Sequence, residues 1–204
     1  MSWDPPAIAS IVEGKGEIPA LPKLLHRIAG EVGIPFLLTP PPWRVNRGTL
    51  VRAGEIERAV NSVADRGGST KAVLVIFDAD DDCPAELAPK LLTRARQARK
   101  DARVAVVLPK SEFEAWFLAA ASSLGGHRGF PVTLNPPSDP EAIRGAKEWL
   151  TRTRTRIGGR PYEPIVDQTP LASVFDLAQA RANSPSFSKF CRDVAWLLGV
   201  APAS

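Results

Sequence analysis

The stretch Val73-Leu74-Val75-Ile76-Phe77-Asp78-Ala79-Asp80-Asp81-Asp82 decides the fold class of this chain. A run of apolar, mostly branched residues is typical of a strand buried on both faces, as in the centre of a parallel sheet. The run ends abruptly in carboxylates, and open α/β sheets bind their ligands at the carboxyl ends of the strands. We therefore expect a central strand that leads directly into a functional loop.

The spacing of Asp78 and Asp80 predicts a cation site. In an extended chain, two side chains at this spacing leave from the same side. Adjacent carboxylates repel each other and raise each other's pKa unless a cation lies between them, and their hard oxygens suit Mg²⁺ or Mn²⁺. The alternative is helix capping, above all for Asp81 and Asp82, because Pro84 is a favourable first residue of a helix.

Other segments of the chain repeat the strand pattern, and helical patterns alternate with them. The strand-like segments are Ala7 to Val12, Pro35 to Leu38 and Arg103 to Leu108. The helical ones run from near Pro19 to about Glu31, from Ala53 to Asp65 and from Pro84 to about Asp101. This alternation predicts an α/β fold with a Rossmann-like, parallel four-stranded sheet flanked by helices.

The chain changes character after residue 124. Residues 125–139 are rich in Gly and Pro, and helices are expected over residues 140–151, 168–182 and 187–198. We expect an α/β core over residues 1–124, with residues 125–204 forming an irregular connector and a C-terminal α-helical subdomain packed on it. The basic run Thr151 to Arg156, followed by Arg160, is either a solvated connector or an arm that contacts phosphates.

Composition limits the class of protein. The 204 residues are 44% hydrophobic, enough for a substantial core, and the net charge of +4 permits a polyanionic partner without demanding one. The two cysteines and two histidines show no zinc or disulfide spacing, which fits a reducing, cytoplasmic setting. We expect no signal peptide at residues 1–6, and no membrane span, because no apolar run reaches about 18 residues.

Further acids follow the first and the last predicted strands. Glu13 comes directly after the first, and Glu112 and Glu114 follow the last. The carboxyl ends of parallel strands share one edge, so these acids are expected to converge with the Asp pair. Each also has a plainer interpretation: Glu13 as a turn carboxylate, and the other two in the first turn of a helix that Ser111 caps.

These motifs resemble the Toprim domain, the metal-binding fold of topoisomerases, primases and some nucleases. The resemblance rests on Val12-Glu13-Gly14-Lys15-Gly16-Glu17 and Asp78-Ala79-Asp80. More closely, the chain is similar to a family of uncharacterised bacterial Toprim-like proteins that are often associated with ATPase genes of presumed phage-defence function. Glu112-Phe113-Glu114-Ala115-Trp116, Asp167-Gln168 and Ser184-Pro185-Ser186-Phe187 carry that closer similarity.

The resemblance implies a two-metal site that activates water and stabilises the leaving oxygen. Its candidate residues are Glu13 as metal ligand or general base, Asp78 and Asp80 as metal ligands, Glu112 or Glu114 as a further ligand, and Glu17 as an additional candidate. Lys15 or Lys110 would balance charge on the scissile phosphate. The implied cofactor is Mg²⁺ or Mn²⁺.

The expected function is that of a metal-dependent nuclease or nuclease subunit, acting on DNA rather than RNA, in phage defence with an ATPase partner. Tyr162 lacks the helical context of a topoisomerase nucleophile. A phosphatase of the haloacid-dehalogenase type is disfavoured, because it would carry its Asp-x-Asp motif on the first strand, whereas Asp78-Ala79-Asp80 follows the third predicted strand. Trp43, Arg44 and Arg47 offer either local packing or stacking and pairing with nucleic acid. The alternative from another class is a non-catalytic module that regulates the ATPase.

Overall fold

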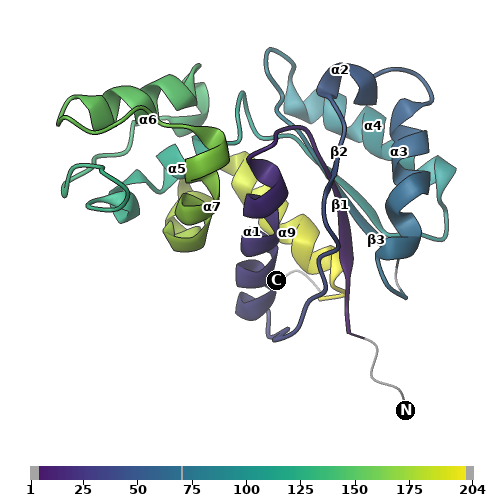
Figure 1. Ribbon diagram of the computed structural model, residues 1–204. Helices are drawn as coiled ribbons and strands as arrows, with labels where there is room; N and C mark the ends of the chain where they lie inside the picture. Colours follow the sequence, from purple (N-terminus) through teal and green to yellow (C-terminus); the bar gives the residue numbers. More distant parts are fainter. Residues whose placement is uncertain (1–4, 70, 201–204) are drawn as a thin grey trace.

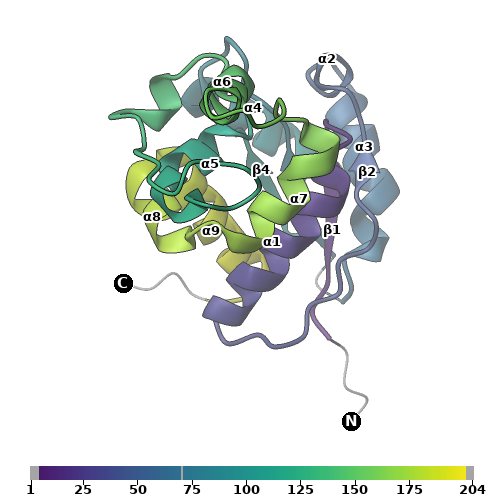
Figure 2. The same ribbon diagram turned by 60° about the vertical axis from the view of Figure 1, so that its left-hand side comes forward.

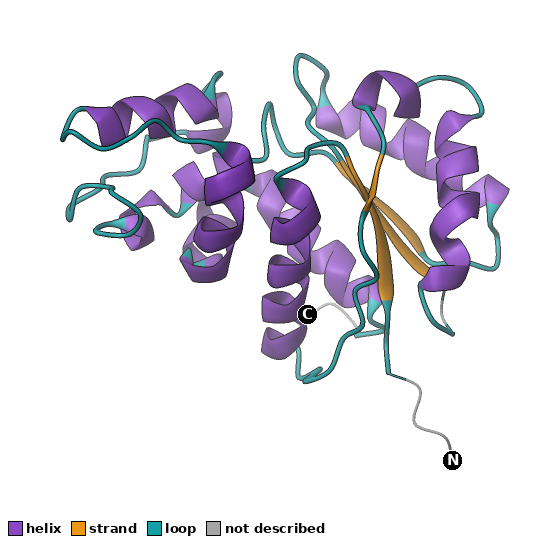
Figure 3. Cartoon of the chain, in the orientation of Figure 1, coloured by secondary structure: helices purple, strands orange, loops and turns teal. Residues whose placement is uncertain are grey.

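The computed structural model describes residues 5–69 and 71–200, and a parallel four-stranded sheet forms its centre (Figures 1 and 3). The strands are β1 (Ile8–Val12), β2 (Trp43–Arg44), β3 (Ala72–Ile76) and β4 (Val104–Val107), in the order β2-β1-β3-β4. Every neighbouring pair is parallel. The predicted α/β class is therefore confirmed.

The central stretch of the sequence forms β3, and each of its residues is buried. Ala72 lies opposite Ile8 of β1, while Val73 lies opposite Val104 of β4. β1 and β4 are also buried throughout. Branched side chains along all three strands fill both faces of the sheet, so the sheet needs a layer of helices on each side.

Helices cover both faces of the sheet. They are α1 (Glu17–Glu31), α2 (Arg47–Leu50), α3 (Glu55–Val63), α4 (Pro84–Ala98), α5 (Ala115–Ala119), α6 (Ala146–Thr155), α7 (Pro164–Val174), α8 (Leu177–Asn183) and α9 (Pro185–Leu197). Short 3₁₀ turns lie at Ala64–Arg66, Ala121–Leu124 and Pro140–Ala142. Among the described residues, no helix has both the length and the apolar character needed to cross a membrane.

Two apolar clusters correspond to the two faces. α3 and α4 pack on the face that carries Val73, Val75 and Val106. α1, α5, α7 and α9 pack on the face that carries Leu74 and Ile76. Figure 2 shows α7 alongside α1, with α9 beyond them, and α9 also contacts β3 and β4.

An aromatic cluster joins the carboxyl-terminal helices to the sheet. Trp116 of α5 stacks on Phe190 of α9 with 4.8 Å between ring centroids, and Phe175 meets Phe117 edge-on at 5.4 Å. The Trp116 indole N–H donates to Ser186 Oγ over 2.8 Å. Residues after 124 thus share one hydrophobic core with the sheet.

The outer edge of β4 is occupied by cationic side chains. Lys189 Nζ donates to the Val106 carbonyl over 2.9 Å, and Arg96 Nε donates to the Val104 carbonyl over 3.3 Å. These carbonyls alternate with the Arg103 carbonyl, which accepts from β3. The Val104 and Val106 carbonyls therefore both point to the side of β4 that faces away from the sheet.

The prediction of a strand over Pro35 to Leu38 was wrong. Only Leu38 pairs there, in an isolated bridge with Ala7, while Phe36 and Leu38 are 64% and 55% exposed. Residues 40–42 are prolines that lack an N–H group and cannot donate to a ladder. Pairing with β1 therefore resumes only at β2, which begins at Trp43.

The helix predicted after Ser111 begins later than expected. Ser111 has a left-handed backbone with φ of 62°, whereas a capping residue is normally extended. α5 starts at Ala115, so Glu112 and Glu114 precede the helix rather than fill its first turn. Neither acid therefore lies in the first turn, and Glu114 is the N-cap residue of α5 without a capping hydrogen bond from its side chain.

Two of the predicted carboxyl-terminal helices are also divided differently. The helix expected over residues 140–151 is a 3₁₀ turn followed by α6, because Gly145 between them is left-handed with φ of 75°. The helix expected over residues 168–182 breaks at Phe175 into α7 and α8. Asp176 then caps α8 by accepting the Gln179 N–H over 2.9 Å.

Candidate functional site

An acid pocket of about 390 Å³ opens beyond the carboxyl ends of β1 and β3. We define it by its polar lining residues, which are Glu13, Lys15, Glu17, Asp78, Asp80, Lys147 and Gln168. The loop after β1, the loop after β3, α6 and α7 all contribute to it. This is the sheet edge at which the sequence predicted a site.

The loop after β1 places Glu13 and Glu17 together. The Glu13 backbone N–H donates to Glu17 Oε2 over 3.2 Å. Gly16 lets α7 approach closely, because a Cβ there would lie 2.2 Å from Gln168 Oε1 and 2.7 Å from the Pro164 carbonyl. Gly16 therefore serves close packing against α7, whereas a Cβ at Gly14 would lie 2.7 Å from Glu17 Oε1.

Asp78 and Asp80 reach the pocket in different ways. Asp78 is 16% exposed, and its Oδ1 accepts the Phe113 N–H over 2.7 Å. Asp80 is left-handed with φ of 51°, is 57% exposed, and pairs with Arg47 Nε at 3.4 Å. The extended geometry expected for this pair was wrong, because β3 ends at Ile76 and the chain turns before Asp80.

Three acids that line the pocket carry raised pKa values. Burial raises the pKa of Glu17 to about 7, and the charge of Glu114 adds to the effect. Burial, followed by the charges of Glu17 and Glu114, raises the pKa of Asp78 well above its ordinary range. Burial also raises the pKa of Glu13, with a smaller contribution from Asp80. Burial, with neighbouring carboxylates, thus disfavours the charged forms of these three acids.

Lys147, at the start of α6, is the cation that faces these acids. Its Nζ lies 2.9 Å from Glu112 Oε1, 3.4 Å from Glu114 Oε2 and 3.7 Å from Asp78 Oδ2. Burial acts to lower the pKa of Lys147, but the charges of Glu114, Asp78 and Glu112 outweigh it and raise that pKa. The lysine therefore remains charged and holds the three acids together.

Glu114 is fully buried behind the pocket. Its Oε1 accepts hydrogen bonds from the Tyr162 hydroxyl over 2.9 Å and from Gln168 Nε2 over 2.8 Å. Burial, reinforced by the charge of Glu114, raises the pKa of Tyr162 well above its ordinary value. Tyr162 is thus a neutral hydrogen-bond donor to Glu114, which agrees with the expectation that it is not a topoisomerase-type nucleophile.

The predicted site residues fall into two groups. Glu13, Asp78 and Asp80 line the acid pocket, as does Glu17. Glu112 and Glu114 do not line the pocket and instead form ion pairs with Lys147. Lys147 lies in a helical segment with no motif that marks it as a site residue, and Gln168 is marked only by the family motif Asp167-Gln168.

The donor set of the pocket suits a hard divalent cation. Within the described residues, the buried Gln168 Oε1 accepts no hydrogen bond, which leaves a neutral oxygen next to the carboxylates. In residues 5–69 and 71–200, no three Asp, Glu, His or Cys side chains are grouped closely enough to hold a metal ion. A cation would therefore have to draw these side chains together.

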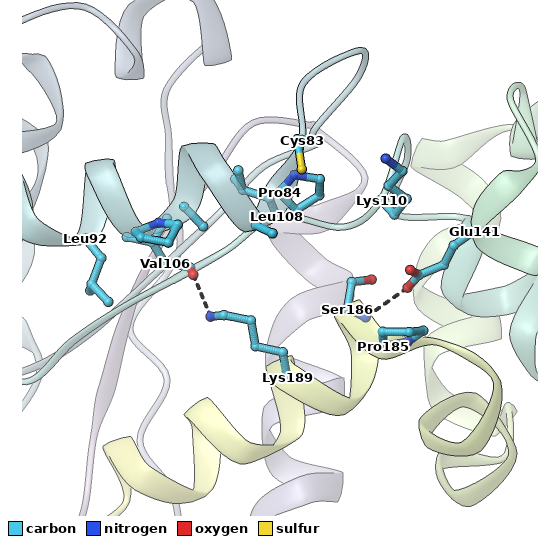
Figure 4. Close-up of a pocket in the computed structure, with 13 residues that line it drawn as sticks. Cys83, Pro84, Leu92, Val106, Leu108, Lys110, Glu141, Pro185, Ser186 and Lys189 are labelled. Atoms are coloured by element: carbon cyan, nitrogen blue, oxygen red, sulfur yellow. Dashed lines mark hydrogen bonds between the residues drawn. The ribbon is translucent and has the colours of Figure 1, made fainter.

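A second hollow, of about 350 Å³, lies between α4, β4 and the start of α9 (Figure 4). Its lining is mostly apolar, and its one carboxylate, Glu141, already accepts the Ser186 N–H over 2.9 Å. Lys110 lines this hollow rather than the acid pocket, so the expected role of Lys110 beside the acids has no geometric support. We place the candidate site in the acid pocket because the titratable groups converge there.

Fold and site together define an α/β protein with a parallel sheet that carries buried carboxylates at its carboxyl edge. The chain belongs to the family described as a domain of unknown function, DUF4276, whose family model matches residues 12–195. No curated protein and no solved structure was found to match the chain. The expectation of a family without an assigned function is therefore confirmed, while the Toprim relationship stays a prediction.

Proposed function

We propose that this protein is a metal-dependent phosphodiester hydrolase, of Toprim-like type, that acts on nucleic acid alone or as a nuclease subunit. The observation that carries the proposal is the gathering of Glu13, Glu17 and Asp78 in one pocket with raised pKa values. Burial, with the charge of neighbouring carboxylates, disfavours the ionised form of these acids, and a divalent cation would favour it.

Glu13, Glu17, Asp78 and Asp80, with Gln168 Oε1, are the groups that would hold Mg²⁺ or Mn²⁺. When bound, such ions generate hydroxide and stabilise the charge that develops on phosphate oxygens. The chain itself contributes orientation, because the Phe113 N–H fixes Asp78. Lys147 offers a permanent positive charge at the rim for a phosphate oxygen.

Metal binding is tested by thermal unfolding with EDTA, Mg²⁺ or Mn²⁺. A ligand at a hundred times its Kd stabilises the folded state by about 2.7 kcal/mol. For a chain of this size that corresponds to a Tm increase of roughly 5–10 °C. Asp80→Asn should reduce this increase, whereas Glu86→Gln, which changes an exposed acid on α4, should retain it.

Activity is tested on supercoiled plasmid, single-stranded DNA and RNA with Mg²⁺ or Mn²⁺. The wild type should cut at least one of these substrates, with DNA preferred, while Asp78→Asn and Glu13→Gln should lose cutting. Equal cutting by all three proteins would identify a contaminant and refute the assignment.

One observation favours a second candidate, a non-catalytic module that regulates an ATPase partner. Lys147 already supplies a positive charge to three of the acids, as an internal substitute for a metal would. If metals leave the Tm of the wild type unchanged and no substrate is cut, this second candidate is preferred. The ATPase partner, a role in phage defence and a cytoplasmic location belong to the proposal in either form.

A further inference from the structure

A cluster of three arginines surrounds one carboxylate in the first turn of α7. Asp167 is fully buried, and its Oδ2 accepts from Arg154 over 2.7 Å. Its Oδ1 accepts from Arg160 over 2.6 Å and from Arg128 over 3.3 Å. Three guanidinium groups facing one carboxylate leave an excess of two positive charges.

Oδ2 of Asp167 is satisfied without the two outer arginines, which are instead the donors to Oδ1. Arg154 is itself only 3% exposed and forms the buried ion pair, and the Glu163 N–H also donates to Oδ2 over 2.9 Å. Burial acts to raise the pKa of Asp167, but the hydrogen bonds from Glu163, Arg154 and Arg160 hold that pKa below its ordinary value. The carboxylate is thus ionised and structural.

Arg128 and Arg160 are held side by side and are partly open to solvent, although Arg160 Nη1 also donates to the Pro161 carbonyl over 3.1 Å. Both donate to the same Oδ1 atom, and both side chains are 41% exposed. Like charges fixed next to each other are unfavourable unless a further anion joins them. Two forked guanidinium groups offer the donor geometry that phosphate oxygens accept.

The pair lies next to the acid pocket along the chain. Asp167 directly precedes Gln168, which lines that pocket, and Tyr162, two residues after Arg160, hydrogen-bonds Glu114. The segment from Arg160 to Gln168 therefore carries Arg160 at one end and part of the pocket wall at the other, and Arg128 contacts this segment at Asp167.

We propose that Arg128 and Arg160 form a phosphate clamp that grips the nucleic-acid backbone beside the acid pocket. The clamp deepens the proposed function, since it rests on nucleic acid as the substrate class, but it does not require catalysis. Asp167 and Arg154 position the pair. This assigns the phosphate-contact role to Arg128 and Arg160, not to the exposed arginines of α6.

Binding of fluorescent single-stranded and duplex DNA is measured with EDTA and again with Ca²⁺, over a series of salt concentrations. Each phosphate contact contributes about 0.9 to the slope of log K against log salt for duplex DNA. The double variant Arg128→Ala/Arg160→Ala should therefore lower that slope by about 2 and weaken binding roughly ten- to a hundredfold at 0.1 M salt.

The matched control is Arg152→Ala/Arg156→Ala, which removes the same charge from exposed positions of the same basic run, where neither side chain has a partner within the described residues. The double variant Arg128→Lys/Arg160→Lys keeps both positive charges, so its slope of log K against log salt should be close to that of the wild type. If the double alanine variant fails to fold, Arg128→Ala alone keeps the test, because Arg128 makes the longest of the three contacts.

Equal losses in the clamp and control variants would overturn the proposal, and so would a wild type that binds no DNA. Stabilisation by inorganic phosphate without DNA binding would identify a small-anion site and also overturn it. DNA binding that depends on the clamp, in a protein that cuts nothing, would support the clamp while the hydrolase proposal fails.

Discussion

Glu17→Gln tests the electrostatics of the acid pocket most directly. Glu17 is 4% exposed, and its pKa of about 7 in the folded protein lies above the ordinary value of 4.5. One pKa unit corresponds to about 1.4 kcal/mol, so ionising Glu17 costs the folded state about 3 kcal/mol at high pH. Glutamine keeps an oxygen to accept the Glu13 N–H but carries no charge.

The expected pH dependence follows from the direction of this change. Between pH 4.5 and about 7 the folded protein binds more protons at Glu17 than the unfolded chain does, so the free energy of unfolding falls as pH rises. At pH 5 the variant and the wild type should be about equally stable. At pH 8, in EDTA, the variant should be more stable by about 3 kcal/mol, or roughly 6–12 °C in Tm.

The measurement is urea or thermal unfolding at a series of pH values, with Glu86→Gln as the exposed control. Asp78 also has a raised pKa, so the free energy of unfolding of the variant should still fall as pH rises, but by less than that of the wild type. Parallel curves for the wild type and Glu17→Gln from pH 5 to 8 would refute the reasoning. If the pocket holds a metal, saturating Mg²⁺ should narrow the difference at pH 8, since the cation supplies the missing charge.

Three further predictions concern groups around the site. Glu114→Ala deprives buried donors of their acceptor and should cost about 3–5 kcal/mol in urea unfolding, whereas Glu112→Ala should cost under about 1 kcal/mol; equal costs would contradict the buried network. Asp167→Asn leaves three guanidinium groups without their counter-ion and should cost about 3 kcal/mol, so an unchanged unfolding midpoint would argue against the ion pair. Iodoacetamide at pH 8 should modify the exposed Cys83 and spare Cys191, whose pKa is raised by burial. Mass spectrometry of the peptides measures both, and faster modification of Cys191 would contradict the prediction.

The sheet was predictable because its signals are local. The unbroken apolar runs at Val73 and Val104 fix two buried strands, and their acids mark one edge. The strand at Trp43 escaped prediction because two residues carry no periodicity, and its exposed side chains give no apolar pattern. The segment from Pro35 to Leu38 has a stronger apolar pattern, but only Leu38 pairs with Ala7 next to β1.

The acids of the site were predictable, but their partners were not. Glu13 and Asp78 follow strands directly, so the fold alone brings them together. Lys147 lies more than thirty residues from Glu112, on a helix whose position depends on the packing of α5, α7 and α9. Arg154 was one of several arginines in a basic run, and only its burial against Asp167 separates it from its neighbours.

The side chains that occupy the edge of β4 affect how copies of this protein can associate. An exposed edge strand invites another chain to extend the sheet and, in partly unfolded protein, to seed aggregation. Here a second strand would have to displace Lys189 from the Val106 carbonyl and Arg96 from the Val104 carbonyl. It would thereby lose two hydrogen bonds from charged donors and bring its own backbone against two cations. β4 is thus protected against intermolecular strand pairing, and an assembly that extended this sheet would have to use its other edge, at β2.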